Sequence, residues 1–423
     1  MRLAPATTRA VSSALLLAAC SGVPEGVVGR CESDVALPAA VTTDILFVVD
    51  NSSSMSQEQA KVVAQLSAFL DSLANAPVQN DFQVGVISTA VTMYANLCGA
   101  NSILTQAEAE AGRLQLGKDL AGNPNPASQR KLLSYDDPDL LEQFGLLIGQ
   151  GTAGLGQEMA LEAMRRALTE PLLSVAPDAT PAGNAGFLRP GSRLLVVIVT
   201  DEDDCSASNP QALLLRSSCT AAPCTVDADC GGEGIYCVVQ GSESARACEL
   251  NSCETPEGRA TLESVTSYVD FLKTLDDGTG SNRQREVSLA VIGPVNAQGE
   301  PERCESSSDE AFGVGRRYQE AVSLMGERGF IGSICNDEYG TTLRQIAELV
   351  AAPQVLELAA NPPDGNLIRV TVERAGVAPI ECKNGDGFVF EPGVDGTPAR
   401  LVMQDRCRLR GDDRISVRFI CAG

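Results

Sequence analysis

Short apolar runs alternate with longer segments whose apolar residues recur every three or four positions. Four runs are too short for helices and rich in Val, Ile and Leu, so they predict buried strands at 45–49, 82–88, 193–200 and 286–292. The periodic segments predict helices at 56–73, 140–148, 157–168, 257–275 and 339–351. Strands separated by helices predict an α/β fold with a doubly wound, mainly parallel sheet.

The pattern changes near residue 356, where short extended runs are separated by Pro, Gly, Asp and Asn turns. Runs at 367–372, 387–390, 399–403 and 415–420 predict a small C-terminal all-β module over 356–423. A disulfide between two of the three cysteines Cys382, Cys407 and Cys421 is expected to hold this module together. Two insertions interrupt the preceding α/β part, one over 93–138 and a cysteine-rich one over 205–256.

The first 19 residues are typical of a secretion signal, with two arginines and a short apolar segment over 11–19. A transmembrane helix needs about twenty apolar residues, so this segment is too short to span a bilayer. Residues 17–20, Leu-Ala-Ala-Cys, resemble a bacterial lipobox. This resemblance implies cleavage after a signal peptide of residues 1–19, a lipid on Cys20, and a place in the cell envelope at the outer membrane. Residues 20–41 would form the lipidated tether.

Cysteine content indicates an oxidising compartment. Of 15 cysteines, setting Cys20 aside leaves 14, an even number that predicts seven disulfides. The preferred pair is Cys304 with Cys335, which flank one predicted crossover. Further candidates lie in the 205–256 insertion, and their spacing leaves the connectivity open: Cys224, Cys237, Cys230 and Cys248. A zinc site is disfavoured because the chain has no histidine and no C-x-x-C pair.

Composition excludes several function classes. Without histidine there is no Ser-His-Asp or Cys-His catalysis, and neither a G-x-S-x-G elbow nor a Walker A loop occurs. Loss of the two signal arginines takes the formal net charge from −23 to −25, which opposes nucleic acids and anionic lipids. Gly149, Gly151 and Gly154 spell G-x-G-x-x-G, but a predicted helix precedes them where a dinucleotide site needs a strand.

One motif carries candidate chemistry. The strand at 45–49 ends at Asp50, and Ser52 and Ser54 follow to give D-x-S-x-S on a strand-to-helix turn. One carboxylate and two hydroxyls suit a hard divalent cation, and ligands bind at the carboxyl ends of strands in open α/β sheets. Ser56 and Gln59 fit an S-x-x-Q capping box for the next helix. The alternative is that Asp and Ser merely cap that helix.

The segment 44–55, DILFVVDNSSSM, resembles the first metal-site motif of the von Willebrand factor A (VWA) domain family. The resemblance covers residues 42–353. It implies a metal ion-dependent adhesion site in which Thr152, from the glycine-rich loop 149–156, and Asp201, after the strand at 193–200, complete the ligand set. The implied ion is Mg²⁺, or else Mn²⁺ or Ca²⁺. Ser53 departs from the family, where many members have glycine. Residues 202–204 are expected to form a solvated acidic rim.

The resemblance implies binding without catalysis. Hydroxyls would contact the ion directly and the aspartates partly through waters, which leaves an open position for a carboxylate from an acidic protein partner. Membrane association would come from the lipid anchor alone. Two alternatives remain open: an envelope component whose metal only stiffens the loops, and a metal-assisted hydrolase.

Overall fold

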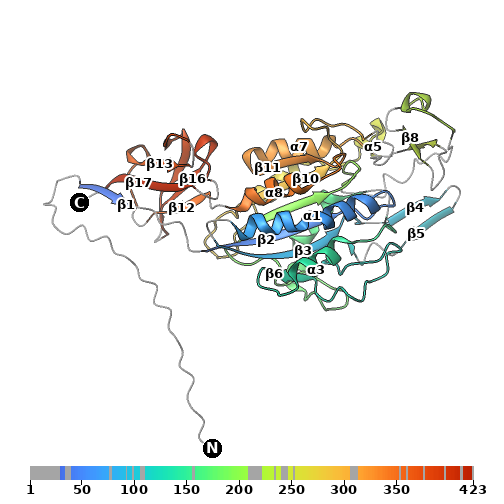
Figure 1. The fold of residues 1–423 in the computed structure, drawn as a ribbon, viewed down its shortest axis with the longest axis horizontal. Helices are drawn as coiled ribbons and strands as arrows, with labels where there is room; N and C mark the ends of the chain where they lie inside the picture. Colours follow the sequence, from blue (N-terminus) through green and yellow to red (C-terminus); the bar gives the residue numbers. More distant parts are fainter. Residues whose placement is uncertain are drawn as a thin grey trace, which may run out of the picture. The chain divides into compact units, whose positions relative to one another are not determined.

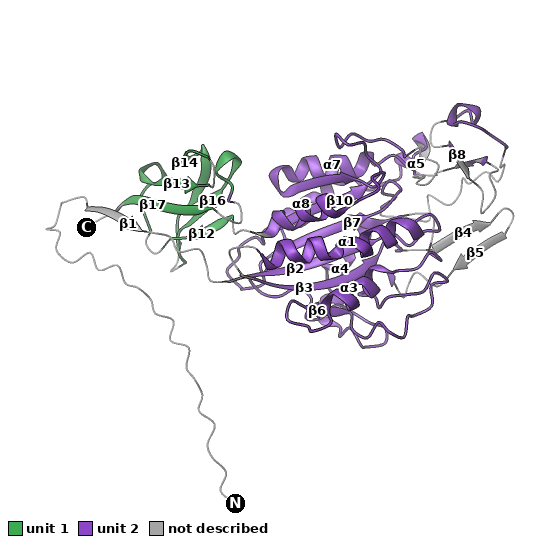
Figure 2. Cartoon of the chain, in the orientation of Figure 1, with its two compact units in different colours: residues 1–36, 354–408, 413–423 green, residues 37–353, 409–412 purple. Residues whose placement is uncertain are grey.

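The computed structural model forms two compact units, which are distinguished by colour in Figure 2. The larger unit contains Leu37–Pro353 and Leu409–Asp412, and the smaller contains Met1–Ala36, Gln354–Arg408 and Asp413–Gly423. The structure describes residues 29–33, 40–75, 79–91, 93–97, 100–104, 110–154, 158–207, 222–232, 235–239, 246–250, 253–304, 313–351, 354–358, 361–374, 377–394, 397–409 and 413–421. The predicted signal peptide and Cys20 lie outside these residues.

A six-stranded sheet forms the centre of the larger unit, in the order β11-β10-β7-β2-β3-β6. Its strands are β2 (Ala40–Val49), β3 (Gln79–Ser88), β6 (Leu132–Ser134), β7 (Arg193–Val199), β10 (Val287–Gly293) and β11 (Gly329–Ser333). Every neighbouring pair is parallel except β3 with the edge strand β6. The predicted α/β class with a mainly parallel sheet is confirmed.

Helices cover both faces of this sheet (Figure 1). One face packs against α1 (Ser56–Ala74), α3 (Leu140–Ile148) and α8 (Gly340–Ala351). The other packs against α4 (Ala160–Ala167), α6 (Val265–Lys273) and α7 (Arg316–Met325). Alternation along β2 explains this, because Leu46 and Val48 enter one core while Ile45, Phe47 and Val49 enter the other.

Several predicted boundaries were wrong. The helix expected at 257–275 is two helices, α5 (Pro256–Arg259) and α6, because Thr255 and Ser264 each start a helix by accepting a hydrogen bond from a backbone N–H three residues on. The helix expected from 157 begins at Ala160. Neither α7 nor β11 was predicted, since α7 buries only a narrow face and β11 is short and rich in glycine.

Inside the predicted insertions, the structure describes two antiparallel hairpins. The first pairs β4 (Met93–Leu97) with β5 (Ala100–Leu104), and the second pairs β8 (Ile235–Val239) with β9 (Arg246–Leu250). Each strand of the second hairpin is joined by a disulfide to the preceding segment, through Cys224 and Cys230, which compensates for the small number of apolar residues.

The smaller unit contains a seven-stranded sheet in the order β1-β17-β13-β14-β15-β16-β12. Its strands are β1 (Gly29–Ser33), β12 (Val355–Glu357), β13 (Arg369–Glu373), β14 (Ile380–Asn384), β15 (Gly387–Glu391), β16 (Arg400–Met403) and β17 (Arg414–Cys421). The sequence pattern anticipated β13, β15, β16 and β17 but not β1, β12 or β14. Gly387 has a φ of +112°, and a Cβ there would lie 2.5 Å from the sulfur of Cys407.

Five disulfides join described cysteines: Cys205–Cys253, Cys224–Cys237, Cys230–Cys248, Cys304–Cys335 and Cys382–Cys407. They include the preferred pair, Cys304–Cys335. The Cys382–Cys407 bridge joins two of the three cysteines that were expected to hold the C-terminal module. The side chains of Cys31, Cys98, Cys219 and Cys421 lie outside the described residues. This disulfide content fits an exported protein. Among the described helices, none has the length and apolarity required to cross a membrane.

An ion-pair network anchors the middle of β2 at Asp44. Asp44 is fully buried, and Arg189 donates to it from Nε at 2.6 Å and from its backbone N–H at 2.7 Å. The same guanidinium reaches Asp81 at 2.8 Å and the carbonyl of Thr43 at 2.9 Å. A buried carboxylate that loses its cationic partner is strongly unfavourable.

We therefore expect Arg189→Ala to destabilise the larger unit by about 3 kcal/mol or more, because Asp44 would remain buried without its cation. The matched control is Arg130→Ala, since the ion pairs of Arg130 with Asp137 and Asp139 are partly exposed and should contribute less than about 1 kcal/mol. Urea unfolding followed by circular dichroism measures both. Equal effects of the two substitutions would contradict this assignment.

Candidate metal centre

Two acidic residues meet at the carboxyl edge of the sheet because their strands are adjacent and in register. Val49 at the end of β2 lies opposite Val199 at the end of β7. Asp50 and Asp201 follow these strands, and the backbone N–H of Asp50 donates to the Val199 carbonyl at 2.9 Å. The two side chains are both buried, with 0% and 3% exposure. The predicted proximity of these two carboxylates follows from strand register alone.

Short hydrogen bonds hold the Asp50 carboxylate in place. Its Oδ2 accepts a hydrogen bond of 2.6 Å from the hydroxyl of Thr200, and its Oδ1 accepts one of 2.7 Å from the backbone N–H of Ser52. Thr200 comes from the end of β7 and Ser52 from the loop after β2. Asp50 therefore ties the two strand ends together.

The two serines of the motif face each other, with 3.0 Å between their hydroxyl oxygens. Ser52 is buried, whereas Ser54 is exposed, and the Ser54 hydroxyl is near enough to Asp201 to lower the pKa of that carboxyl. The serine hydroxyls thus connect Asp50 to Asp201, and the cluster reaches solvent at Ser54. A cation here would meet two hydroxyl oxygens near two carboxylates.

Gln59 plays a different part from the predicted one. The first turn of α1 has no side-chain cap, so the expected capping box is wrong. The Gln59 amide instead donates to the carbonyls of Asp50 at 2.8 Å and Gly151 at 3.0 Å, and its oxygen accepts from the Gln150 N–H at 3.1 Å. Gln59 thereby joins the motif loop to the glycine-rich loop.

Close packing explains one glycine of that second loop. The Gly154 N–H donates to the Asn51 carbonyl at 2.8 Å, and a Cβ on Gly154 would lie 2.3 Å from Asn51 Oδ1. The loop follows helix α3, not a strand, so the context that a dinucleotide fingerprint needs is missing.

Thr152 lies in this loop, and its hydroxyl donates to the Leu120 carbonyl at 3.0 Å. Within the described part of the chain, that hydroxyl forms no hydrogen bond with Asp50, Ser52, Ser54 or Asp201. The structure therefore brings together four of the five predicted ligands. A ligand role for Thr152 stays a prediction.

Glu158 belongs to the cluster but was not predicted from the sequence. It immediately precedes α4, its side chain is 1% exposed, and it accepts a hydrogen bond from the Thr89 hydroxyl. Its Oε1 has no hydrogen-bond partner among the described atoms, and the nearby Asp50 carboxylate is another acceptor. One signal was available: an acid directly before three apolar residues, 159–161, is a candidate for burial with the start of that helix.

Burial raises the pKa of Asp50, Glu158 and Asp201. For Glu158 and Asp201 the next largest cause is the charge of Asp50, which raises the pKa of both carboxyls well above the usual range. Hydrogen bonds from Thr200, Thr89 and Ser54 offset part of this effect. Close carboxylates that repel one another are stabilised by either a proton or a cation.

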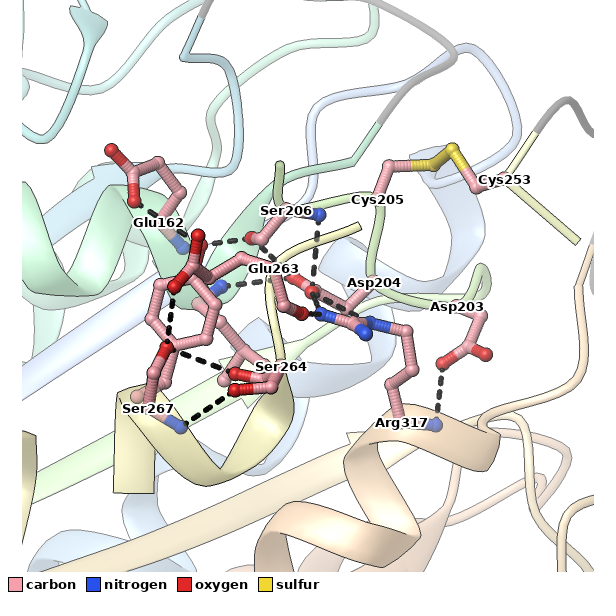
Figure 3. Close-up of polar contacts among 12 residues, drawn as sticks. Glu162, Asp203, Asp204, Cys205, Ser206, Cys253, Glu263, Ser264, Ser267 and Arg317 are labelled. Atoms are coloured by element: carbon pink, nitrogen blue, oxygen red, sulfur yellow. Dashed lines mark hydrogen bonds and ion pairs between the residues drawn. A yellow bond between two sulfur atoms is a disulfide. The ribbon is translucent and has the colours of Figure 1, made fainter. Parts of the chain in front are cut away.

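The acidic run after β7 does not form the expected solvated rim, because Glu202, Asp203 and Asp204 are all at most 5% exposed. Arg317 of α7 donates to Asp204 Oδ2 from two nitrogens at 3.1 Å, and its backbone N–H donates to Asp203 at 3.0 Å (Figure 3). That expectation was wrong because it ignored α7, which brings a cation from distant sequence.

The same run caps α4. Asp204 Oδ1 accepts from the Leu161 N–H at 3.0 Å, and the Ser206 hydroxyl accepts from the Glu162 N–H at 2.8 Å. These bonds satisfy N–H groups that a helix terminus leaves without intrahelical partners. Next to them, the Cys205–Cys253 disulfide closes the base of the cysteine-rich insertion (Figure 3).

The donor set fits a hard cation. In the described chain, Cys224, Cys230 and Cys248 are the one group of three potential ligand residues whose ligand atoms lie within 4.8 Å of one another, and their sulfurs are already in disulfides. The carboxylates of the cluster are spaced more widely. Mg²⁺ would therefore contact hydroxyls and reach part of the carboxylates through the waters that it commonly retains.

Comparisons with known proteins leave the family open. No protein-family model and no curated protein matches the chain. The pilus adhesin SpaC from Lactobacillus rhamnosus GG, in an open conformation, is similar at a TM-score of 0.34 and 11% identity, covering 93% of this chain and 42% of SpaC. Proximal thread matrix protein 1 from the mussel byssus has a TM-score of 0.31 and 11% identity, covering 76% of this chain and 51% of that protein. The chain thus spans about half or less of each, and these scores carry no argument about function.

The raised pKa values predict a pH dependence of the metal-free protein. A carboxyl whose folded-state pKa is raised stabilises the fold below its unfolded pKa of about 4 and loses that contribution as pH rises through the folded value. In a chelator, the wild-type melting temperature should therefore fall more steeply above about pH 4 than that of Asp50→Asn, which removes one of the interacting charges. Thermal unfolding by circular dichroism measures both profiles, and parallel profiles would refute the coupling.

Proposed function

We propose that this chain is an exported, lipid-anchored protein of the bacterial cell envelope that binds a protein partner through a divalent cation. The larger unit would be a doubly wound VWA-like domain, and the smaller a C-terminal β module. One observation carries the proposal: the hydroxyls of Ser52 and Ser54 lie 3.0 Å apart between the buried carboxylates of Asp50 and Asp201. This oxygen-rich edge suits Mg²⁺, Mn²⁺ or Ca²⁺.

The geometry supports an exchangeable position on the ion. Asp50 and Ser52 are buried, but Ser54 is exposed, so the solvent side of the cation would remain accessible at Ser54. An oxygen donor of a partner could replace water there. If Asp50 and Asp201 were the only acidic ligands, their charge would balance the ion and a partner carboxylate could bind. The charge of the whole site therefore determines which donor the partner supplies.

A binding role is favoured over catalysis because the chain contains no histidine to act as a general base. A purely structural metal is the second candidate, and Gln59 supports it, since this residue already joins the two loops that an ion would stiffen. Capture of envelope proteins on the immobilised chain separates the two roles. A partner retained in Mg²⁺ and released by a chelator supports binding, and metal binding without such a partner supports the structural role.

Asp50→Asn is expected to weaken Mg²⁺ and Mn²⁺ binding at least about tenfold, because it removes a charge that holds the ion. The fold should persist, since the substituted group keeps its shape. Isothermal titration calorimetry measures the affinity, and circular dichroism checks the fold. Asp270→Asn, an exposed charge on α6, is the matched control and should bind as wild type. Unchanged affinity in Asp50→Asn would defeat the metal assignment.

Lipid anchoring has its own test. Cys20→Ser should move the protein from the membrane fraction to the soluble fraction, because a formal charge of −25 offers no attraction to anionic lipid. Fractionation and mass spectrometry of the processed N-terminus give the readout. A variant that stays with the membrane after signal cleavage would show that the lipobox interpretation is wrong.

A further inference from the structure

We infer that Glu158, and not Thr152, is the ligand that the segment between α3 and α4 supplies to the cation, and that the resulting three-carboxylate site selects a neutral oxygen donor from the partner in place of a carboxylate. This inference rests on the proposed cation site and specifies its chemistry. It departs from the pattern implied by the resemblance to VWA domains, in which the glycine-rich loop supplies the hydroxyl of a threonine.

The position of Glu158 supports its role as a ligand. Its side chain is 1% exposed, and one oxygen accepts the Thr89 hydroxyl. The other oxygen, Oε1, has no hydrogen-bond partner in the described part of the molecule. Asp201, which is 3% exposed, likewise has an oxygen, Oδ1, without a hydrogen-bond partner among the described residues. Buried carboxylate oxygens without donors are costly, and a cation between them would satisfy both.

The backbone around Glu158 is fixed, so its side chain is already directed toward Asp50. The Glu158 carbonyl accepts from the Cys205 N–H at 2.6 Å, and the next N–H, of Met159, donates to the Thr89 carbonyl at 3.2 Å. Both partners belong to segments that leave the ends of β7 and β3, the strands on either side of β2. A ligand held in this way needs little rearrangement to bind an ion.

Thr152 lacks these properties. Its side chain is only half-buried, and its hydroxyl donates its proton to the Leu120 carbonyl at 3.0 Å. The loop backbone offers little adjustment at its neighbour Gly151, which has a φ of +74° and where a Cβ would lie 2.3 Å from the Asp119 carbonyl. The segment between α3 and α4 thus offers a half-buried hydroxyl that is already hydrogen-bonded and, six residues on, a buried carboxylate oxygen that lacks a donor.

The charge of the site supports the preference for a neutral oxygen donor. Asp50, Glu158 and Asp201 together bring three negative charges to a cation with two positive charges. The loaded site would keep a net charge of about −1, and the buried Glu202 lies close enough to add to the negative potential. A carboxylate from a partner would then be repelled. A backbone carbonyl, a hydroxyl or an amide oxygen can fill the open position without that penalty.

The test compares the mature full-length wild type with Glu158→Gln, Thr152→Val and Asp50→Asn by titration calorimetry with Mn²⁺. We expect Glu158→Gln to lose at least about tenfold in affinity and Thr152→Val to stay within about twofold. Glu158→Asp keeps the charge on a shorter side chain and should retain part of the affinity. This variant keeps the test informative if Glu158→Gln fails to fold. Circular dichroism checks every fold.

The outcomes separate this inference from the proposed function. Loss of binding in Asp50→Asn with full binding in Glu158→Gln overturns the role of Glu158 and leaves the cation site standing. Loss in Thr152→Val without loss in Glu158→Gln restores the hydroxyl ligand. If the wild type binds no Mn²⁺, the proposed cation site fails, and this inference fails with it.

The donor preference is tested with acetate as the carboxylate probe. At saturating Mn²⁺, the relaxation rate of water protons reports whether acetate displaces water from the ion. Acetate should leave the wild type unchanged and should displace water in Glu158→Gln, where one negative charge is gone. Equal displacement in both proteins would overturn the preference for a neutral donor.

Discussion

The register of β2 against β7 is the constraint on which the candidate site depends. Val49 opposite Val199 delivers Asp50 and Asp201 side by side at the carboxyl edge of a sheet whose two faces are both covered by helices. Burial there removes water from the carboxylates, so their charges interact strongly. Thr200, Ser52 and Gln59 fix the surrounding atoms, and Glu158 adds a third charge from the start of α4. The divalent cation that we propose would balance these charges in their buried position.

The same acidic run shows two ways in which one fold stabilises buried acids. Asp204 is neutralised within the chain, by the guanidinium of Arg317 and by the Leu161 N–H of α4 (Figure 3). Asp201, three residues earlier, has hydroxyl and carboxylate neighbours and an oxygen without a donor among the described residues. A carboxylate in a complete ion pair stabilises the fold by itself. A buried carboxylate without a compensating charge is instead suited to bind a positively charged ligand.

Local patterns predicted what depends on local physics. Apolar runs and helical periodicity located β2, β3, β7, β10 and most helices, and the order of strand, loop and helix placed Asp50 and Asp201 at one edge. The errors came from long-range contacts. Gln59 was assigned to a helix cap but reaches Gly151, 92 residues away. Residues 202–204 looked solvated because α7, which supplies Arg317, carries too weak an apolar pattern to be recognised. Glu158 was missed because a single acid before a helix looks like an ordinary first-turn residue.

A crystal of the mature protein soaked in Mn²⁺ tests the central claim most directly, because anomalous scattering locates the ion independently of any assumed ligand. We expect one strong anomalous peak beside the hydroxyls of Ser52 and Ser54. A Glu158 oxygen should point to this ion, and Asp50 and Asp201 should surround it. A peak coordinated by Thr152 with Glu158 still turned to Thr89 would contradict the carboxylate-rich site. No peak at this edge of the sheet would contradict the cation site altogether.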